Sequence, residues 1–285
     1  MDAAERALLE EALRKTLTTS GPGAEPGAAL AGLGWAEMLA EEPGTAIPLV
    51  FRLLGETGTQ APVLNDVVLQ VAGRPPGGAP SLPYAGGAWV RWAQGEDAAG
   101  GPLDPELPLH PAHPQDLPAA AVAAGRLALG WWLLGTGRAM LSLTREHVLD
   151  REQFGRPLAS FQALRHRLAE TYVALEAAEA VLIAEVASEV GHTAGEGTEA
   201  LDDADALPHP GALLAKAAAG RAALTAARHC QQALGGIGFT AEHALHRHVK
   251  RALVLDGLLG STRELTREAG QLLLREMRAR RLVDL

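Results

Sequence analysis

The chain of 285 residues has a single cysteine, few aromatic side chains (4%) and fewer basic than acidic residues. The lone Cys230 cannot form an intrachain disulfide, which favours a reducing compartment. With 25 basic against 34 acidic side chains and a net charge of -9, the sequence lacks the basic surface that binds nucleic acid or anionic lipid. We therefore expect neither nucleic acid nor a membrane among its partners.

Long apolar runs are also lacking. The longest lies between Arg126 and Arg138 and includes Trp131 and Trp132, and it is far shorter than the roughly 20 residues that span a bilayer. The residues that follow Met1 include acidic side chains and no apolar segment of the kind found in secretory signals. We expect the apolar run to be a buried helix and the protein to be cytoplasmic.

The abundant residues are alanine, leucine and glycine, a composition that favours helices over strands. Five segments beyond residue 118 have apolar residues at three- and four-residue spacing and are predicted to be helices: 119–149, 160–190, 211–234, 244–255 and 262–281. Their short connections favour an antiparallel helix bundle. Residues 191–210, rich in Gly, Glu, Asp and Pro, are expected to form a solvated linker.

The first part of the chain differs from the rest. Residues 1–60 carry short helical patterns that Gly and Pro interrupt. Residues 61–118 are crowded with Pro and Gly around two short apolar runs, 67–71 and 88–92, which are interpreted as strands of a small β patch or as parts of an ordered coil. The predicted fold class is mostly α, with a helical region 1–60, a central segment 61–118 with little β, and a bundle 119–285.

Two motifs lie at the ends of the predicted long helices. Residues 151–158 read Arg-Glu-Gln-Phe-Gly-Arg-Pro-Leu and are followed by Phe161 and Gln162, and residues 232–239 read Gln-Ala-Leu-Gly-Gly-Ile-Gly-Phe. Glycines permit positive φ and let the backbone come close to a ligand, although they also end helices without any ligand. In this order, the two motifs resemble the signatures of the acyl-CoA dehydrogenase superfamily.

The resemblance implies FAD and acyl-CoA as ligands, enclosed by an N-terminal helical domain, a central β-domain and a C-terminal helix bundle. Residues 61–118 are much shorter than such a β-domain, so they are interpreted as its remnant. Arg151 is implied to bind the FAD pyrophosphate through bidentate hydrogen bonds, with a helix-end salt bridge as its structural alternative. The other implied cofactor contacts are Phe154, Gln162, Gln232, Gly235, Gly236 and Ser261, of which Phe154 is equally well explained as a core residue and the glutamines as surface residues.

The family's reaction needs a carboxylate that takes the α-proton of the thioester. In many members it is the Glu of a Glu-Gly-Thr segment, and here the matching residue is Leu259, followed by Gly260 and Ser261. The alternative position on the first long helix holds Gly125. Neither residue is a base, and the nearby Glu264 is interpreted as a solvated helix-start residue beside an N-cap at Ser261 or Thr262. No catalytic residue is therefore predicted.

Two groups of histidines are candidate metal ligands. His110 and His113 are close in sequence, and so are His243, His246 and His248, and imidazole is a common zinc ligand. Neither group comes with a cysteine or a clear fourth ligand. No metal site is predicted.

Taken with the resemblance, these residues predict an FAD-associated, base-lacking subunit of a heteromeric acyl-CoA dehydrogenase. A homologous subunit, in a heterodimer or heterotetramer, would supply the catalytic base for α,β-desaturation of an acyl-CoA thioester. The resemblance links such split enzymes to bulky, steroid-derived acyl groups. Three alternatives stay open: a homodimer, a non-enzymatic interaction protein that has lost flavin, and an enzyme that works alone with an unrecognised base.

Overall fold

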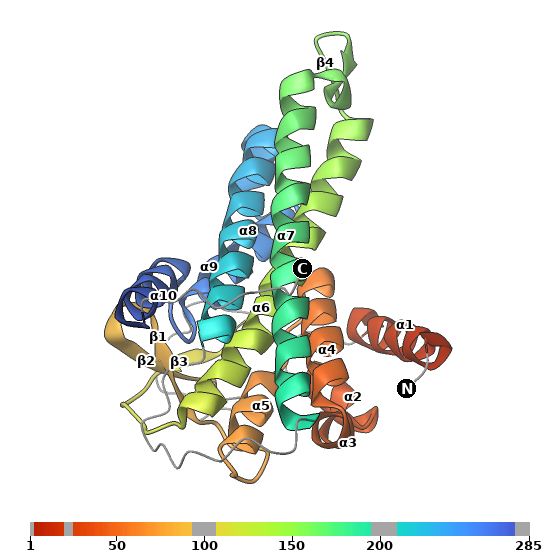
Figure 1. Ribbon diagram of the computed structural model, residues 1–285. Coiled ribbons are helices and arrows are strands. Elements are labelled where there is room, and N and C mark those ends of the chain that lie inside the picture. Colours follow the sequence, from red (N-terminus) through yellow and green to blue (C-terminus); the bar gives the residue numbers. More distant parts are fainter. Residues whose placement is uncertain (1–2, 20–24, 93–106, 195–209, 277–285) are drawn as a thin grey trace.

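The computed structural model describes residues 3–19, 25–92, 107–194 and 210–276 (Figure 1). Short helices lie within residues 1–60, as predicted: α1 (Ala3–Thr19), α2 (Glu25–Gly32), α3 (Trp35–Glu41) and α4 (Pro43–Thr57). A further helix, α5 (Val63–Val71), lies in the segment 61–118, where no helix was predicted. The strand interpretation of residues 67–71 is wrong, because they belong to α5. Leu64, Val67 and Val68 are all buried, which is the three- and four-residue spacing of a helix face, but a run of five residues is too short to reveal it.

A small antiparallel sheet follows, with the strand order β1-β2-β3. The strands are β1 (Ser81–Tyr84), β2 (Ala88–Trp92) and β3 (Leu109–Pro111), so the predicted strand 88–92 is confirmed. Trp92 at the end of β2 stacks on Trp132 of the bundle with ring centroids 5.5 Å apart, and Phe51 of α4 meets the same Trp132 edge-on at 5.7 Å. These three aromatic rings join the sheet, the N-terminal helices and the bundle in one core.

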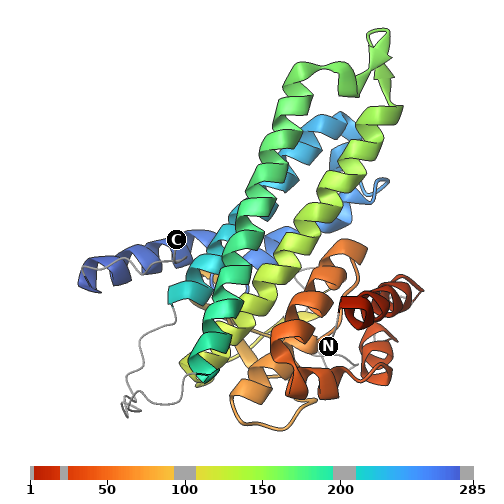
Figure 2. The ribbon, with the colours of Figure 1, turned by 45° about the vertical axis from the view of Figure 1, so that its right-hand side comes forward.

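Five helices form the bundle, as predicted: α6 (Ala119–Asp150), α7 (Gln162–Ala194), α8 (Pro210–Leu234), α9 (Leu245–Gly257) and α10 (Thr262–Glu276). The long helices α6, α7 and α8 run alongside one another, and α6 also packs on α4 (Figures 1 and 2). By length and composition α6 would qualify as a membrane span, but 72% of its most apolar window is buried in the protein. This is the buried helix expected for the apolar run. The expected linker lies mostly outside the described residues, because α7 continues to Ala194.

The close contact between α4 and α6 depends on two glycines. A Cβ on Gly135 would lie 2.1 Å from the carbonyl oxygen of Arg52, and a Cβ on Gly55 would lie 2.4 Å from the backbone nitrogen of Thr136. Both neighbours are main-chain atoms, so no side-chain rotation relieves either clash. The two helix backbones therefore touch directly.

One end of the bundle carries both sequence motifs. A hairpin of β4 (Glu152–Gln153) and β5 (Arg156–Pro157), followed by the 3-10 turn η2 (Leu158–Ser160), joins α6 to α7 at the tip of the bundle (Figure 1). At the C-terminal end of α8, the glycine motif forms the 3-10 turn η3 (Gly235–Phe239), after which α9 turns back. The loop between α9 and α10 lies at the other end of α9, about 20 Å from η3 for a helix of 13 residues.

Candidate functional site

The loop between α9 and α10 holds Leu259, the residue at the family's base position. Its φ of 58° is left-handed, which is rare for a residue other than glycine, and Gly260 follows with a φ of 100°. The Leu259 N–H donates to the carbonyl of Pro83 at 2.8 Å, and Leu258 forms a β-bridge with Tyr84. The loop thus pairs with the outer edge of β1, which fixes where the Leu259 side chain points.

The Leu259 side chain fills the space beside Gly125, the alternative base position on α6. Leu259 is 1% exposed, and its Cδ1 would lie 2.6 Å from a Cβ on Gly125. Two side chains of α5 close the same space, because that Cβ would be 3.1 Å from Val68 Cγ2 and 3.8 Å from Leu64 Cδ1. The two positions at which the resemblance placed a base are therefore in contact, and both are apolar.

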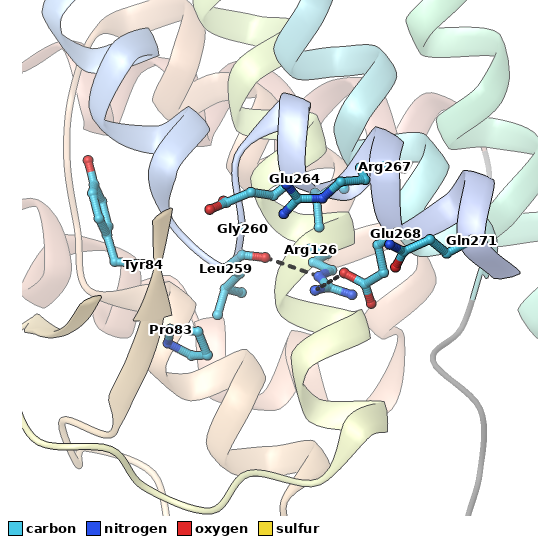
Figure 3. A pocket seen from close by; sticks show the side chains of 10 residues that line it. Pro83, Tyr84, Arg126, Leu259, Gly260, Glu264, Arg267, Glu268 and Gln271 are labelled. Carbon is cyan, nitrogen blue, oxygen red and sulfur yellow. Dashed lines mark hydrogen bonds and ion pairs between the residues drawn. The ribbon is translucent and has the colours of Figure 1, made fainter. Parts of the chain in front are cut away.

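The buried Lys216 and the partly buried Arg126 hold the loop and the end of α9 by carbonyl groups. Arg126, next to Gly125, donates from Nε to the Leu259 carbonyl at 3.1 Å, and its Nη2 lies 3.6 Å from the Glu268 carboxylate (Figure 3). Lys216 of α8 donates to the carbonyls of Asp256 at 2.9 Å and Gly260 at 2.5 Å. Burial lowers the pKa of Arg126 and lowers the pKa of Lys216 to about 7. Lys216 is thus committed to main-chain oxygens, and Arg126 to one main-chain oxygen and the Glu268 carboxylate.

Glu264, the carboxylate nearest the loop, is fully engaged. One of its oxygens accepts from the Ser261 N–H at 2.9 Å and the Ser261 hydroxyl at 2.7 Å, and the other accepts from the Gly86 N–H at 2.8 Å. Hydrogen bonds from the Gly86 and Ser261 backbones lower the pKa of Glu264 to about 2. Ser261 directly precedes α10, so the pair forms a capping box, as expected for a helix-start glutamate.

These residues line an open cavity of about 330 Å³, which we call the Leu259 cavity (Figure 3). It is lined by Pro83, Tyr84, Arg126, Leu259, Gly260, Glu264, Leu265, Arg267, Glu268 and Gln271. Ser261, a predicted cofactor contact, belongs to this end of α9. It is therefore far from the other predicted contacts, which lie at the hairpin end.

A second cavity, of about 350 Å³, lies where α6 ends, and we call it the Arg151 cavity. It is lined by Leu143, Glu146, His147, Asp150, Arg151 and His243. The rings of His147 and His243 meet edge to face, with centroids 6.0 Å apart. Burial, then His243 and then Arg151, lower the pKa of His147. The cavity joins Arg151 of the first motif to the turn that follows the second motif.

The hairpin beyond Arg151 presents aromatic side chains to solvent. Phe154 is 89% exposed with a φ of 56°, so the interpretation of Phe154 as a core residue is wrong. Its ring meets Phe161 edge-on at 6.1 Å, and the Arg156 guanidinium lies 4.1 Å from the Phe161 ring centroid. Gln162 is exposed, with its amide 3.4 Å from His166. The hairpin is an ordered surface with little cover from its own chain.

The glycine turn is open on its outer side. Gly235 has a φ of 65°, and a Cβ on Gly235 or Gly236 would meet no atom within 4 Å. Gly238 is different, because its Cβ would lie 2.9 Å from the carbonyl of Gln231. Gln232 is exposed on the last turns of α8. A ligand can thus reach the backbone of Gly235 and Gly236, while Gly238 serves packing.

A bundle of this topology, with a glycine turn and an Arg-x-x-Phe-Gly hairpin at one end, defines the helical C-terminal domain of an acyl-CoA dehydrogenase. Residues 117–269 match the family described as acyl-CoA dehydrogenase, C-terminal domain, and the chain belongs to this family. The predicted family and the predicted fold class are confirmed.

Among curated relatives, the acyl-CoA dehydrogenase IpdE2 of Mycobacterium tuberculosis is 40% identical over 135 residues, which cover 47% of this chain and 36% of the relative. The match thus spans little more than a third of that protein. Among solved structures, a variant of the steroid ACAD Tcur3481-Tcur3483 has a TM-score of 0.71 at 18% identity and covers 96% of this chain and 99% of that one. The ChsE4-ChsE5 complex of Mycobacterium tuberculosis has a TM-score of 0.68 at 17% identity, with 98% and 99% covered.

Reasoning from the sequence missed the two histidines of the Arg151 cavity as a pair. His147 precedes Arg151 by four residues, one helical turn, and that spacing was the available signal. His243 was considered only with His246 and His248, but His248 is buried, with its pKa lowered to about 4 chiefly by burial. Among the described residues, no group of three or more His, Cys, Asp or Glu side chains is arranged to hold a metal ion.

Proposed function

We propose that this chain is the FAD-associated, base-lacking subunit of an acyl-CoA dehydrogenase that desaturates an acyl-CoA thioester between its α- and β-carbons. A homologous subunit supplies the catalytic base, while this chain supplies FAD contacts and a subunit interface. The observation that carries the proposal is the contact of Leu259 with Gly125, because it fills both base positions with apolar atoms.

Removal of the α-proton needs a base within hydrogen-bond distance. In the Leu259 cavity the carboxylates are otherwise engaged: Glu264 accepts three hydrogen bonds and has a pKa of about 2, and Glu268 pairs with Arg126. Lys216 and Arg126 are bound to loop carbonyls. The described residues of this cavity therefore favour a chain that does not take the proton itself.

The residues at the hairpin end suit a flavin dinucleotide. FAD, when bound, supplies the acceptor for the hydride from the β-carbon. We assign Arg151 to the diphosphate, because a guanidinium gives bidentate, charge-assisted hydrogen bonds to phosphate oxygens. The exposed amides of Gln162 and Gln232 and the open backbone of Gly235 and Gly236 offer further donors, and the exposed Phe154 offers an apolar contact. Ser261, held in the capping box at the other end of α9, is proposed as a contact of a different part of the cofactor.

The partner is proposed from the nature of these surfaces. Arg151 and Phe154 are both exposed on this chain, so a flavin bound there is proposed to be shared with another subunit. The ChsE4-ChsE5 complex and the steroid ACAD Tcur3481-Tcur3483 are each named for two components, which supports a heterodimer or heterotetramer and a bulky, steroid-derived acyl group. Residues 61–118 are proposed as the remnant of a central β-domain that the partner retains in full.

The test is co-expression of this chain with the product of a neighbouring dehydrogenase gene, followed by purification, a flavin spectrum and an acyl-CoA oxidation assay. A yellow complex that is active only as a pair is expected. Arg151→Ala and Gly236→Val should each lower its FAD content, with Gly270→Ala on α10 as a control, since a Cβ there meets no atom within 4 Å. Colourless protein that pairs with nothing would identify an interaction protein without flavin, and turnover by the chain alone would reveal an unrecognised base.

A further inference from the structure

Helix α7 turns an apolar face to solvent. Between Thr171 and Ala187, every exposed residue of α7 is apolar. Three of these residues are large: Tyr172 and Ile183 are each 55% exposed, and Val173 is 64% exposed. In Figure 1, α7 runs down the front of the bundle, and its other side packs on α6 and α8. With the exposed alanine one turn earlier, these residues form what we call the α7 stripe: Ala169, Tyr172, Val173, Ala177, Ala180, Ile183 and Ala187.

The stripe has the spacing of a helix that packs on a second helix. Six positions of α7 recur alternately every four and three residues, and five of them belong to the stripe: 169, 173, 176, 180, 183 and 187. This spacing is that of the seam along which two helices pack in a coiled coil. A surface helix that already buries one side normally has polar residues on the other. An apolar seam on the solvent side of α7 therefore indicates another helix as its partner.

The charged groups beside the stripe are held at one edge. Arg138 of α6 donates to Glu176 at 3.1 Å and also to Glu179. Glu176, the one polar residue of the seam, is thus turned toward α6 and paired within its own chain. The two carboxylates and one guanidinium leave a net negative charge at this edge, which disfavours an anionic lipid surface as the occupant. They suit the polar rim that surrounds the apolar core of a protein interface.

The sizes of the side chains along the seam are symmetric about its midpoint. Val173 and Ile183 lie five residues before and after position 178, and Ala169 and Ala187 lie nine residues before and after it. An antiparallel copy of α7 therefore brings Ile183 to the level of Val173 and Ala187 to the level of Ala169. The alanines nearest the midpoint let the two helix backbones come close. A two-fold interface requires such self-complementarity, because both copies offer the same surface.

We infer that the α7 stripe binds a second copy of this chain, with the two α7 helices antiparallel about a two-fold axis at the level of residue 178. The inference goes beyond the proposed function and does not depend on it. The seam is about 27 Å long on a helix about 10 Å wide, so the helix pair alone buries less than the roughly 1,200 Å² of a standard interface. The dimer is therefore expected to be weak, with a dissociation constant in the micromolar range.

The test is sedimentation equilibrium of the purified full-length chain at concentrations from about 1 to 200 μM, where a monomer–dimer equilibrium is expected. Ile183→Lys places a charge in the apolar seam of both copies, and Ala180→Lys keeps the two backbones apart. Each should raise the dissociation constant at least about tenfold. Leu253→Lys is the matched control, because Leu253 is 58% exposed on a different helix, and it should leave the equilibrium unchanged. Salt at about 0.5 M should not weaken an apolar contact.

Cross-linking reports the direction of the pairing. In the antiparallel dimer, residue 173 of one copy lies level with residue 183 of the other, whereas the two residues 173 lie about 15 Å apart along the helices. A short bismaleimide should therefore join Val173→Cys to Ile183→Cys in a mixture of the two variants far more readily than it joins either variant to itself. The native Cys230 is buried and should not react.

Circular dichroism shows whether each variant keeps the helix content of the wild type, and if one lysine variant does not, the other decides the outcome. A chain that stays monomeric over the whole range, or a dimer that neither lysine variant weakens, would overturn the inference. Flavin binding by the co-expressed complex would be unaffected by that result, so the FAD-subunit proposal would stand. If Ile183→Lys instead releases the co-expressed homologous subunit, the stripe binds that subunit and the inference of a second copy is wrong.

Discussion

Because Leu259 contacts Gly125, Gly125→Ala should destabilise the wild-type protein but stabilise the Leu259→Ala variant. Gly125→Ala places a methyl group 2.6 Å from Leu259 Cδ1 in a buried site. Alanine gains about 1 kcal/mol over glycine inside a helix, but the overpacking costs about 1–3 kcal/mol, so the single variant should be less stable by up to about 2 kcal/mol.

Leu259→Ala should by itself cost about 2–5 kcal/mol, because it removes a buried leucine side chain and leaves a cavity. In that background the methyl of Ala at position 125 no longer meets Leu259 Cδ1. The remaining close neighbour is Val68 Cγ2 at 3.1 Å, so the methyl fills part of the cavity and the helix preference is recovered. Gly125→Ala should then stabilise the protein, and the coupling energy between the two sites should be about 1–3 kcal/mol, the overpacking cost that Leu259→Ala removes.

Urea unfolding of the wild type, both single variants and the double variant, followed by circular dichroism, gives this coupling energy. Each variant needs an unchanged dependence of the unfolding free energy on urea, since a change would report on the unfolded chain instead. Additive effects would show that the two base positions do not touch in solution. The argument that Leu259 closes the site would then be refuted.

Three other predictions concern the loop and the α4–α6 contact. Glu264→Gln should lower the melting temperature at neutral pH. Since the Glu264 pKa is lowered from 4.5 to about 2, the carboxylate stabilises the wild type fully above about pH 4.5, and this stabilisation is lost as pH falls through 2. Thermal melts of the variant at several pH values should therefore show a smaller fall in melting temperature towards low pH than melts of the wild type. The pKa of Lys216 is about 7 in the folded chain and 10.5 when free, so the unfolded chain binds more protons between pH 7 and 10.5. The free energy of unfolding of the wild type should therefore rise with pH over this range. Urea titrations of Lys216→Met at several pH values should show no such rise. Gly135→Ala should cost about 3 kcal/mol or more or prevent folding, because its Cβ would meet the Arg52 carbonyl, whereas Gly270→Ala, with open space around it, should gain up to about 1 kcal/mol in the same unfolding assay.

Long helices could be predicted from the sequence, whereas short ones could not. The long helices α6, α7 and α8 repeat their apolar spacing over many turns, so their existence and approximate ends were predictable. The five residues 67–71, four of them apolar, cover little more than one turn, and their helix is recognisable only once their burial against the bundle is known. The pairing of β1 with Leu258 and Leu259 joins segments that no local pattern relates.

The site residues that belong to short sequence motifs were predictable. The resemblance to the family identified both motifs, and counting from them located both empty base positions, but counting does not reveal that Leu259 lies on Gly125. Likewise, nothing near His147 in the sequence indicates His243 as its neighbour, because the two meet only after α7 and α8 have packed on α6. Contacts between distant segments are set by packing of whole helices, and a single sequence carries no direct signal of them.

The way in which the loop is held explains how a chain of this fold can lack the base and remain intact. Arg126 and Lys216 donate to the carbonyls of Leu259, Gly260 and Asp256, and these oxygens are present whatever side chain occupies position 259. The capping box at the start of α10 and the pairing with β1 likewise use Ser261, Glu264 and backbone atoms. A change at position 259 therefore leaves the anchors of the loop in place. Since α9 separates this loop from the glycine turn by about 20 Å, closing the base position leaves the proposed cofactor contacts of the hairpin end unchanged.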